Sequence, residues 1–301
     1  MNISPNAGNA GGPVRLLNFG CGGTFHPDWT NLDASPVSPA VIAHDVTRRF
    51  PFADSTFDAA YGSHVLEHLE PAVAEEVLRD GFRILKPGGI IRIAVPDLES
   101  IARLYLSSLE GALNGERESE TRYDWLMLEL YDQAVRKVSG GRMAAYMAEH
   151  GDRTRSHFVA ERIGCEGSRA MASQPSGFSI TSRVLRKLRS MADSMRRTAA
   201  IASASVFLGP RGAAALREGL FRNVGEVHQW MYDRYSLPRV LRQVGFASIQ
   251  ERLAGESDIP GFAGYELEII RGRERKPDSL YMEGRKPAAT RDLQKNVQLP
   301  L

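Results

Sequence analysis

Two histidines and a glutamate lie close together in the segment His64-Val65-Leu66-Glu67-His68. Because His64, Glu67 and His68 are spaced i, i+3 and i+4, one helical turn would place all three on one face. A histidine there could act as a general base near neutral pH. The three side chains, joined by a distant histidine such as His228, could instead hold a divalent metal that activates an oxygen. A third interpretation is a structural network at the start of a helix, and the residues alone leave all three open.

A glycine-rich turn follows the apolar run Val14–Phe19. Gly20 and Gly22 would let backbone N–H groups approach a ligand closely. A dinucleotide site of the G-x-G-x-x-G type is not indicated, because Phe25 occupies the third glycine position and the acidic Asp33 comes too early. No Gly-Lys-Ser/Thr follows, which excludes a P-loop. Taken alone, the turn is either a ligand cradle or a tight turn and nothing more.

A third polar group lies at residues 228–233. His228 is a second candidate base, and Asp233 is a weaker one. The alternative is that Asp233 caps a helix beginning near Ser236, with Trp230 and Tyr232 as core aromatics. We favour the core position for Trp230.

The elements that must position these residues alternate between apolar runs and crossovers, which predicts an α/β, doubly wound sheet that is mostly parallel and buried on both faces. The first two crossovers, Gly20–Trp29 and Ala34–Ala40, are shorter than the usual dozen residues, so we expect loops there instead of helices. A turn of strong breakers, Lys86–Gly89, precedes the fifth strand. The predicted strands are Val14–Phe19, Trp29–Asp33, Val41–Asp45, Phe57–Gly62 and Ile90–Val95, with a helix over Pro71–Leu85.

After Asp97 the pattern becomes helical and stays so to about residue 224, which predicts a large helical insertion after the fifth strand. We therefore divide the chain into a flexible leader (1–13), a ligand-binding core (14–97 plus 225–286), an insertion serving as a substrate lid (98–224) and a polar tail (287–301). The helices predicted in the insertion are Tyr123–Val138, Arg142–His150, Ser182–Ala200 and Arg211–Leu220. After the insertion, the core is predicted to continue with a helix over Ser236–Val244 and strands over Phe246–Leu253 and Ser279–Lys286.

The composition is that of a soluble globular protein of 301 residues, with 38 basic and 36 acidic side chains and a net charge of +2. This excludes a disordered chain and a disulfide-stapled miniprotein, and it argues against a general nucleic-acid binder. Cys21 and Cys165 lie far apart, make no metal-type pair and fit a reducing compartment. We expect a cytoplasmic protein, because residues 1–12 lack an apolar core and the run Ala199–Gly209 is too short to span a bilayer.

The average charge conceals one strongly basic segment, residues 183–222, which carries nine basic and only two acidic side chains. Within it, Val184, Leu188, Met191 and Met195 form an apolar stripe at helical spacing. A basic amphipathic helix is typical of a surface that contacts an anionic membrane or an anionic ligand, possible carriers being a sugar nucleotide, a lipid-pyrophosphate-linked glycan or an anionic lipid. The alternative is a lid helix packed on the sheet with a solvated basic side.

Several short motifs in this order resemble the class I S-adenosylmethionine (SAM)-dependent methyltransferases across residues 14–97. Segments 225–233 and 279–283 look like one subfamily of predicted bacterial methyltransferases that is associated with surface-polysaccharide biosynthesis. The motifs are Leu17-Asn18-Phe19-Gly20-Cys21-Gly22-Gly23, Asn31-Leu32-Asp33, Asp45, Pro51-Phe52-Ala53-Asp54-Ser55-Thr56-Phe57-Asp58, His64-Val65-Leu66-Glu67-His68-Leu69 and Leu85-Lys86-Pro87-Gly88-Gly89.

The resemblance implies a role for each cofactor-site residue. Gly20 and Gly22 would pass beneath the amino-acid part of SAM, Asp33 would accept from both ribose hydroxyls, and Asp45 would lie by the adenine. Asp45 could otherwise be a turn residue at a strand end. Asn18 replaces the acidic residue usual in the family, so the methionine ammonium loses a charged partner. Cys21, in the glycine turn, and Ser63, at the end of the fourth strand, complete the predicted cofactor contacts.

The resemblance also bears on the reaction. Some ubiquinone-pathway and small-RNA methyltransferases carry Glu-x-x-Glu-His at this place and bind magnesium or a similar ion, whereas His64 in the first position suits a softer metal. We expect O-methylation of a sugar or glycan hydroxyl, with His64, His68 or His228 as the base. The alternatives are a small-molecule or protein acceptor, or a SAM-binding regulatory or scaffold protein without catalysis. A nicotinamide-dependent oxidoreductase is excluded by the incomplete glycine motif.

Overall fold

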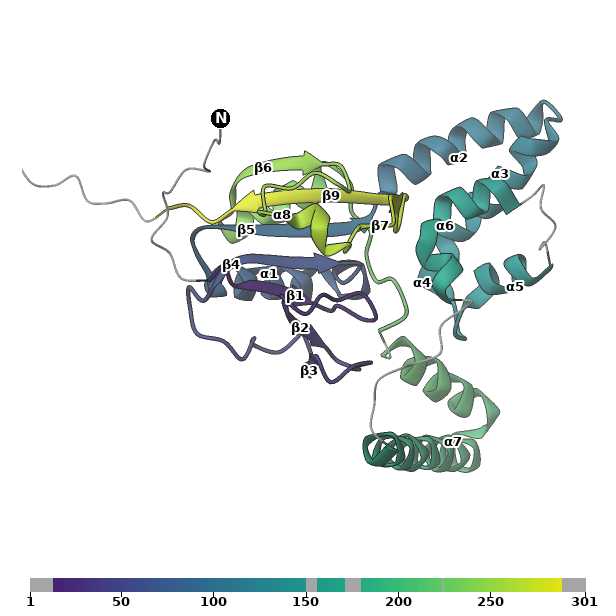
Figure 1. The fold of residues 1–301 in the computed structure, drawn as a ribbon. Helices are drawn as coiled ribbons and strands as arrows, with labels where there is room; N and C mark the ends of the chain where they lie inside the picture. Colours follow the sequence, from purple (N-terminus) through teal and green to yellow (C-terminus); the bar gives the residue numbers. More distant parts are fainter. Residues whose placement is uncertain (1–12, 150–155, 171–179, 224, 289–301) are drawn as a thin grey trace, which may run out of the picture.

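The computed structural model describes residues 13–149, 156–170, 180–223 and 225–288, so most of the predicted leader and tail lie outside the described residues. Its centre is a seven-stranded sheet with the strand order β3-β2-β1-β4-β5-β9-β6 (Figure 1). The strands are β1 (Leu16–Phe19), β2 (Thr30–Asp33), β3 (Val41–Ala43), β4 (Phe57–Ser63), β5 (Leu85–Pro96), β6 (Ala247–Arg252) and β9 (Ser279–Arg285).

The first five strands run parallel, whereas β9 pairs antiparallel with both β5 and β6. The chain reverses its direction of travel across the sheet between β1 and β4, and ligands of such sheets bind beyond the carboxyl ends of the strands at this point. The predicted fold class is thereby confirmed.

The two faces of the sheet are covered differently. The helices α1 (Pro71–Ile84) and α8 (Ser236–Val244) pack on one face, where they bury leucine, valine and phenylalanine side chains of the strands. On the other face, Trp29 and Tyr61 pack against Phe262 and Leu267, which come from the segment after β6. This loop segment takes the place of crossover helices, because the predicted short crossovers after β1 and β2 are confirmed as loops. It also carries the small hairpin of β7 (Ile269–Ile270) and β8 (Arg273–Glu274).

The predicted helical insertion begins directly after β5 and is confirmed. Its helices stand beside the carboxyl end of the parallel strands (Figure 1). Within the insertion, the buried Glu129 accepts from the Trp125 indole and pairs with Arg162 at 2.7 Å, which ties three of its elements together. The elements are α2 (Leu98–Leu113), α3 (Arg117–Met127), the π-helical turn η2 (Leu128–Asp132), α4 (Gln133–Val135), α5 (Gly141–Glu149), α6 (Ser156–Ala170) and α7 (Ile180–Arg222).

One local prediction was wrong, and another is confirmed. The breaker segment 86–89 belongs to β5, because Leu85 already pairs with Phe57 and the ladder tolerates an irregularity before Ala59. The two helices expected over 182–200 and 211–220 are confirmed as the two parts of α7, because the backbone leaves the helical conformation at Gly209 (φ +71°), directly before Pro210.

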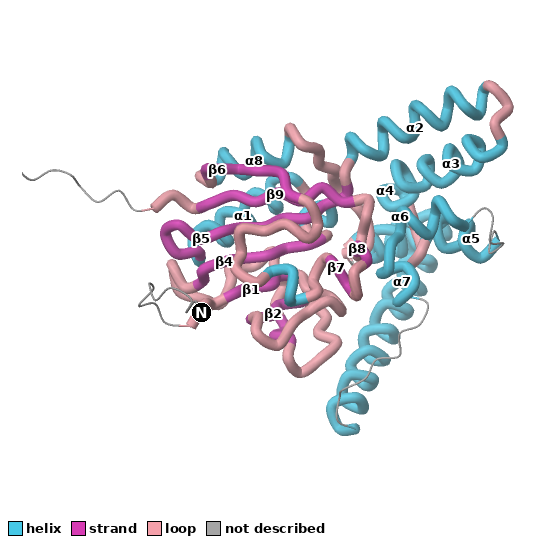
Figure 2. Tube along the Cα trace, turned by 45° about the horizontal axis from the view of Figure 1, so that its top comes forward, coloured by secondary structure: helices cyan, strands magenta, loops and turns pink. Residues whose placement is uncertain are grey.

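The helix α7 does not pack on the sheet in its described part. Figure 2 shows α7 extending away from the sheet, and Met195 is 71% exposed. The side chains of Val184, Leu188 and Met191 lie outside the described ones. By length and composition alone, Ser194–Arg222 would suffice to cross a membrane, in contrast to the expectation from its longest apolar run.

Candidate active site

The glycine turn is fixed by two separate requirements. Gly20 has φ +63°, and a Cβ atom there would lie 2.4 Å from the Val65 Cγ2 atom, so the turn crosses the segment after β4 at a distance that only glycine allows. Gly22 has φ +53° and donates its N–H to Asp33 Oδ2 at 2.8 Å. The turn after β1 is therefore tied to the end of β2.

A cavity of 510 Å³, here called the glycine-side cavity, opens at this turn. Asp33 stands in its wall at the end of β2, and Asp45 stands there just after β3. Asp45 Oδ1 accepts from the backbone N–H and hydroxyl of Thr47, which lowers the pKa of its carboxyl. Other parts of the wall come from Gly20, Thr47, Val65 and Leu69 and, much later in the chain, from Arg222, Asn223, Gly225 and Gln229.

Four predicted cofactor contacts are not in the wall of the glycine-side cavity: Asn18, Cys21, Gly22 and Ser63. Asn18 is 1% exposed and donates to the carbonyl of Thr24 and to Asn31 Oδ1, so it braces the loop after β1. Burial raises the pKa of the Cys21 thiol to about 12. Ser63 accepts from the Arg275 guanidinium. Their role as cofactor contacts stays a prediction.

His64 follows β4 with an unusual backbone conformation, φ +54°. Its Nδ1 atom lies 3.0 Å from Glu67 Oε1, and its Nε2 atom lies 2.8 Å from the hydroxyl of Ser279. Burial and the nearby cations Lys276 and Arg275 hold its pKa well below the usual range. Because Nε2 contacts Ser279 and Nδ1 lies against the buried Glu67, neutral His64 is suited to positioning its neighbours.

Glu67 is fully buried in the 3₁₀ turn η1 (Leu66–His68). Neither of its carboxylate oxygens has a hydrogen-bond partner, because the geometry of the close approach by His64 is not that of a hydrogen bond. Burial raises the pKa of this carboxyl to about 8. An unpartnered carboxyl of this kind is costly to bury and needs an explanation.

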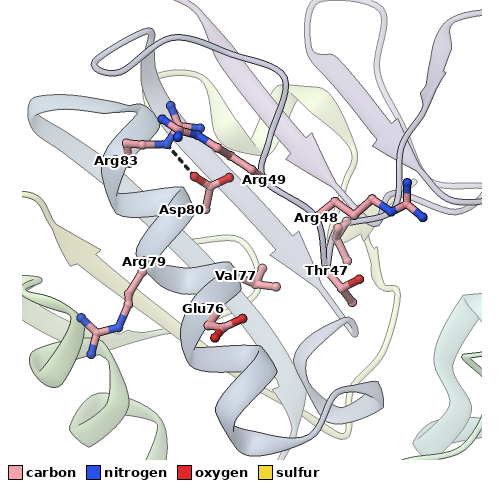
Figure 3. A pocket seen from close by; sticks show the side chains of 9 residues that line it. Thr47, Arg48, Arg49, Glu76, Val77, Arg79, Asp80 and Arg83 are labelled. Carbon is pink, nitrogen blue, oxygen red and sulfur yellow. Dashed lines mark hydrogen bonds and ion pairs between the residues drawn. The ribbon is translucent and has the colours of Figure 1, made fainter.

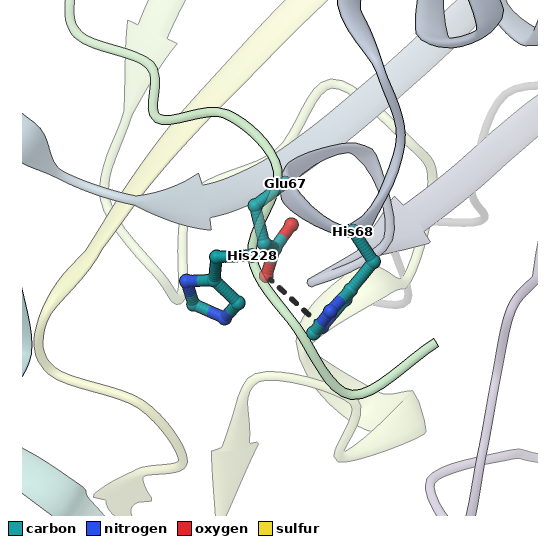
Figure 4. A group of neighbouring side chains, drawn as sticks. All are labelled: Glu67, His68 and His228. Carbon is teal, nitrogen blue, oxygen red and sulfur yellow. Dashed lines mark ion pairs between the residues drawn. The ribbon is translucent and has the colours of Figure 1, made fainter. Parts of the chain in front are cut away.

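His68 and His228 face each other beside Glu67, with ring centroids 4.8 Å apart (Figure 4). His68 Nδ1 lies 3.4 Å from the carbonyl of Val227, so that nitrogen carries the proton and Nε2 keeps a lone pair. Burial lowers the pKa of His68 to about 4 and that of His228 to about 2. Both rings are therefore neutral at neutral pH.

Backbone hydrogen bonds hold the 227–230 segment against η1. The N–H groups of Gln229 and Trp230 donate to the carbonyl of Glu67, and that of His228 donates to the carbonyl of Gln133 in the insertion. The structure in this way brings together all four polar residues singled out in the sequence, although His228 is 160 positions from His68.

Three of the four could hold a metal. The ligand atoms of Glu67, His68 and His228 all lie within 4.8 Å of one another. Neutral imidazole nitrogens and an unpartnered carboxylate are the donors of a borderline ion such as zinc, so the residues present fit that group. His64 is not one of this set, because its ring is turned toward Ser279.

A second cavity of 300 Å³, here called the insertion-side cavity, opens on the other side of the histidines. His64 and His68 line both cavities. Burial, together with Glu129, raises the pKa of Asp278 to about 6. Five polar residues of this wall are not among the site residues predicted from the sequence: Gln133, Arg136, Glu226, Lys276 and Asp278.

The sequence signals for these residues were the place of Glu226 in the motif 225–233 and that of Asp278 directly before the last strand. Arg136 forms ion pairs with Asp132 and Glu226, each at 3.1 Å, and no local sequence pattern predicts these pairs.

The other residues singled out in segment 228–233 are Asp233, Tyr232 and Trp230. Asp233 accepts from the backbone N–H groups of Tyr235 and Ser236 at the start of α8, although Tyr235 and not Asp233 is the N-cap residue of this helix. Tyr232 is buried in the core as predicted. The core prediction for Trp230 was wrong, because its side chain is 50% exposed.

A third cavity, of 390 Å³, lies between the β3–β4 connection and α1 (Figure 3). It adjoins the glycine-side cavity through Val46 and Thr47. Arg83 pairs there with Asp80 at 2.6 Å and with Asp54 at 2.8 Å, so these charges hold the connection to the helix. None of the four polar residues at the histidines reaches this cavity.

Residues 17–93 match a family model described as a methyltransferase domain. Together with the sheet topology, this match indicates a methyltransferase domain with a Rossmann-like sheet in this part of the chain. The match covers the first five strands, which include the glycine turn and the His64–His68 segment. No curated protein sequence matches the chain.

Three similar solved structures illustrate the range of matches. The [4+2]-cyclase SpnF is 24% identical over 28% of this chain and 39% of its own, with a TM-score of 0.23. A chain in the complex of the Haloferax volcanii Trm112 activator with a putative methyltransferase is 12% identical over 91% and 85%, with a TM-score of 0.36. A possible histamine N-methyltransferase from Thermotoga maritima is 10% identical over 92% and 84%, with a TM-score of 0.34.

Proposed function

We propose that this methyltransferase binds SAM in the glycine-side cavity and transfers its methyl group to a sugar or glycan hydroxyl held in the insertion-side cavity. The observation that carries the proposal is that His64 and His68 line both cavities. A transferase needs its two reactants to meet at one place, and these two histidines mark that place.

The cofactor half of the proposal depends on Asp33 and Asp45. Each oxygen of Asp33 already accepts one backbone N–H, from Gly22 and Ser35, and keeps a second lone pair for the ribose diol. The glycine turn leaves the wall beside Asp33 free of side chains, so a backbone-lined approach for the amino-acid part remains open. Asp45 stands across the cavity for the adenine amine.

The chemical half depends on His68. SAM supplies an activated methyl group on a sulfonium, so the protein must align the hydroxyl oxygen and remove its proton. His68 Nε2 carries the free lone pair at the junction, and it would take that proton as the new O–CH₃ bond forms and the C–S bond breaks. His64 and Glu67 fix the turn that presents this ring, and His228 closes its far side.

The acceptor class follows from the wall of the insertion-side cavity. Nine of its eleven residues are polar, and both signs of charge are present. Such a wall offers many donors and acceptors for the hydroxyls of a sugar, whereas a small apolar acceptor would be poorly matched. A small-molecule or protein acceptor is the alternative outcome of the test below.

Titration calorimetry tests the cofactor half. We expect SAM and S-adenosylhomocysteine to bind and NAD not to bind. Asp33→Ala should weaken SAM binding about 100-fold, since two hydrogen bonds to a charged group are lost. Asp28→Ala is the matched control, because Asp28 is an exposed carboxylate in the neighbouring loop. Binding of NAD, or full SAM affinity in Asp33→Ala, would overturn the assignment of the cavity.

Turnover tests the chemical half. With labelled SAM and panels of free sugars, sugar nucleotides and proteins, label should enter the sugar panels. His68→Ala should keep SAM affinity and lose at least about 100-fold in turnover. Loss of SAM binding in this variant would instead make His68 a cofactor contact. Tight SAM binding without transfer to any panel would favour the regulatory or scaffold alternative.

A further inference from the structure

The helix α7 presents a concentrated apolar tip at its backbone break. Val206, Phe207 and Leu208 are consecutive, and they are 79%, 84% and 71% exposed. Gly209 breaks the helix directly after them, and Pro210 starts the second arm. Residues 198–210 contain no charged side chain. Single exposed apolar residues are common on soluble proteins, but three in a row at a projecting turn mark an interaction site.

The exposed apolar surface continues from the tip, residues 206–208, along the part of α7 that precedes Gly209. Met195, Ala199, Ala202 and Val206 are spaced i, i+4, i+7 and i+11, and all four are exposed. This spacing places them on one side of the helix, so tip and stripe form one surface. We call Met195 to Leu208 the apolar arm.

A basic rim borders the apolar arm. Arg196 and Arg197 precede the tip, and Arg211, Arg217 and Arg222 follow it. The single acid between residues 194 and 222 is Glu218, which pairs with Lys137 at 2.8 Å. An apolar surface surrounded by arginines complements the interface of an anionic membrane.

The break makes the segment better suited to lie in a membrane surface than to cross the bilayer. The helix before the break begins at Ile180, but its stretch without charged side chains, residues 198–208, is only about 16 Å long at the usual rise. The hydrocarbon core of a bilayer is about 30 Å thick. The composition of Ser194–Arg222 is apolar enough for a membrane span, but its helix is interrupted at Gly209 and its uncharged stretch is shorter than the hydrocarbon core.

A second copy of this chain is a poorer occupant than a lipid surface. Two copies related by a twofold axis would bring the same patch to itself. The arginines of the rim would then face arginines, and the one carboxylate of this segment is already paired. An anionic lipid surface meets the rim with opposite charge.

We propose that the apolar arm inserts into the interface of an anionic membrane and that the acceptor is presented there, as a glycan or sugar on an anionic lipid carrier. The second arm runs from Pro210 to Arg222, and Arg222 lines the glycine-side cavity. Membrane docking thereby places the site next to the lipid surface. The carrier part rests on the proposed function, whereas membrane binding does not.

Co-sedimentation with vesicles tests the docking without cofactor or acceptor. The vesicles are phosphatidylcholine alone or an equimolar mixture with phosphatidylglycerol, each at low and high salt. We expect binding to the mixed vesicles, weakened by salt and weak on phosphatidylcholine. The double variant Phe207→Ser/Leu208→Ser should lose at least about tenfold in vesicle affinity. Arg197→Gln/Arg211→Gln should lose binding only to the mixed vesicles.

A matched double variant controls for the loss of exposed apolar surface in general. Leu113→Ser/Tyr131→Ser removes side chains that are 75% and 58% exposed elsewhere on the insertion, and it should bind vesicles like the wild type. All these positions are exposed, so the thermal transition should be unchanged. Absence of vesicle binding in the wild type would overturn the proposal. An equal loss of vesicle affinity in Phe207→Ser/Leu208→Ser and in Leu113→Ser/Tyr131→Ser would also overturn it. So would a dimer in size-exclusion chromatography that only the tip variant abolishes.

The lipid-carrier part has its own readout. With labelled SAM and a lipid extract, the wild type should move label into the organic phase. The tip variant should lose this transfer while keeping its SAM affinity. Label in water-soluble sugars alone, with unchanged rate in the tip variant, would overturn the lipid-carrier acceptor. Absence of SAM binding would overturn the proposed function and leave the vesicle result standing.

Discussion

The two cavities that meet at His64 and His68 are built in different ways. Much of the glycine-side cavity comes from short turns at the ends of β1, β2 and β3, in the order of the sequence. The insertion-side cavity is assembled from η2 and α4, the 226–228 segment and the loop before β9, which are held together by buried ion pairs and backbone hydrogen bonds. Cofactor binding should therefore respond to local changes of the turns, and acceptor binding to the packing of the whole insertion.

The largest expected effect comes from a change within the insertion, which should disturb the insertion-side cavity and leave the glycine-side cavity intact. Glu129→Ala leaves the buried Arg162 without its partner, which typically costs about 3–5 kcal/mol. Because the side-chain hydrogen bonds of Glu129 join it to Trp125 and Arg162, both in the insertion, we expect the insertion to melt first while SAM affinity is retained. Calorimetric melting with and without SAM measures this. Glu118→Ala, which removes an exposed carboxylate on α3, should change little, and equal loss of SAM binding in Glu129→Ala would contradict the separation.

The next effect acts on the glycine-side cavity alone. Gly20→Ala adds a Cβ atom against Val65 and forces a left-handed backbone conformation, at a cost of about 1–2 kcal/mol before the clash. SAM affinity should fall by at least about tenfold. Gly23→Ala is the control, since a Cβ atom there meets nothing within 4 Å. Titration calorimetry of both variants decides, and identical affinities would show that the turn is not part of the cofactor site.

The buried histidines beside Glu67 give a pH dependence of stability. The folded-state pKa of His228 is about 2 and that of His68 about 4, against an ordinary 6.5. The unfolded chain takes up these protons first, so the stability from neutral histidines is complete above about pH 6.5 and is lost as the pH falls. Glu67, with a pKa of about 8, acts in the opposite sense, and its contribution is lost as the pH rises from 4.5.

The variant His228→Gln should reduce the acid-side slope of stability by about 1.4 kcal/mol per pH unit below pH 6. Urea unfolding between pH 5 and pH 7 measures the slope. His157→Gln is the control, because His157 is exposed on α6. An unchanged slope in His228→Gln would mean that this ring is not held neutral in the folded protein.

The smallest expected effect concerns the metal. With His68 as the base, turnover needs no ion, so treatment with EDTA should leave it unchanged. Loss of turnover that zinc restores in the wild type, but not in Glu67→Gln, would assign Glu67, His68 and His228 to a metal centre. In that case the acceptor oxygen would be activated by the ion instead of by His68.

The sequence by itself determined the sheet, the short crossovers, the glycine turn and the positions of Asp33 and Asp45 on it. These features depend on neighbours in the chain: alternation of apolar runs with turns, and a left-handed φ that glycine adopts at Gly20. Even here Asn18 was assigned to the cofactor but braces a loop, because a strand residue's spacing does not say which loop covers it.

Only the tertiary structure decided the insertion-side cavity and the surroundings of the histidines. Arg136, Glu226 and Asp278 come from three separate segments, and burial shifts the pKa of Glu67, His68 and His228 by amounts that no local pattern encodes. The same holds for α7, whose apolar stripe fits both a packed lid and a surface arm. Packing contacts across long sequence separations decide between such alternatives, because the free energy of burying a side chain depends on what surrounds it in space.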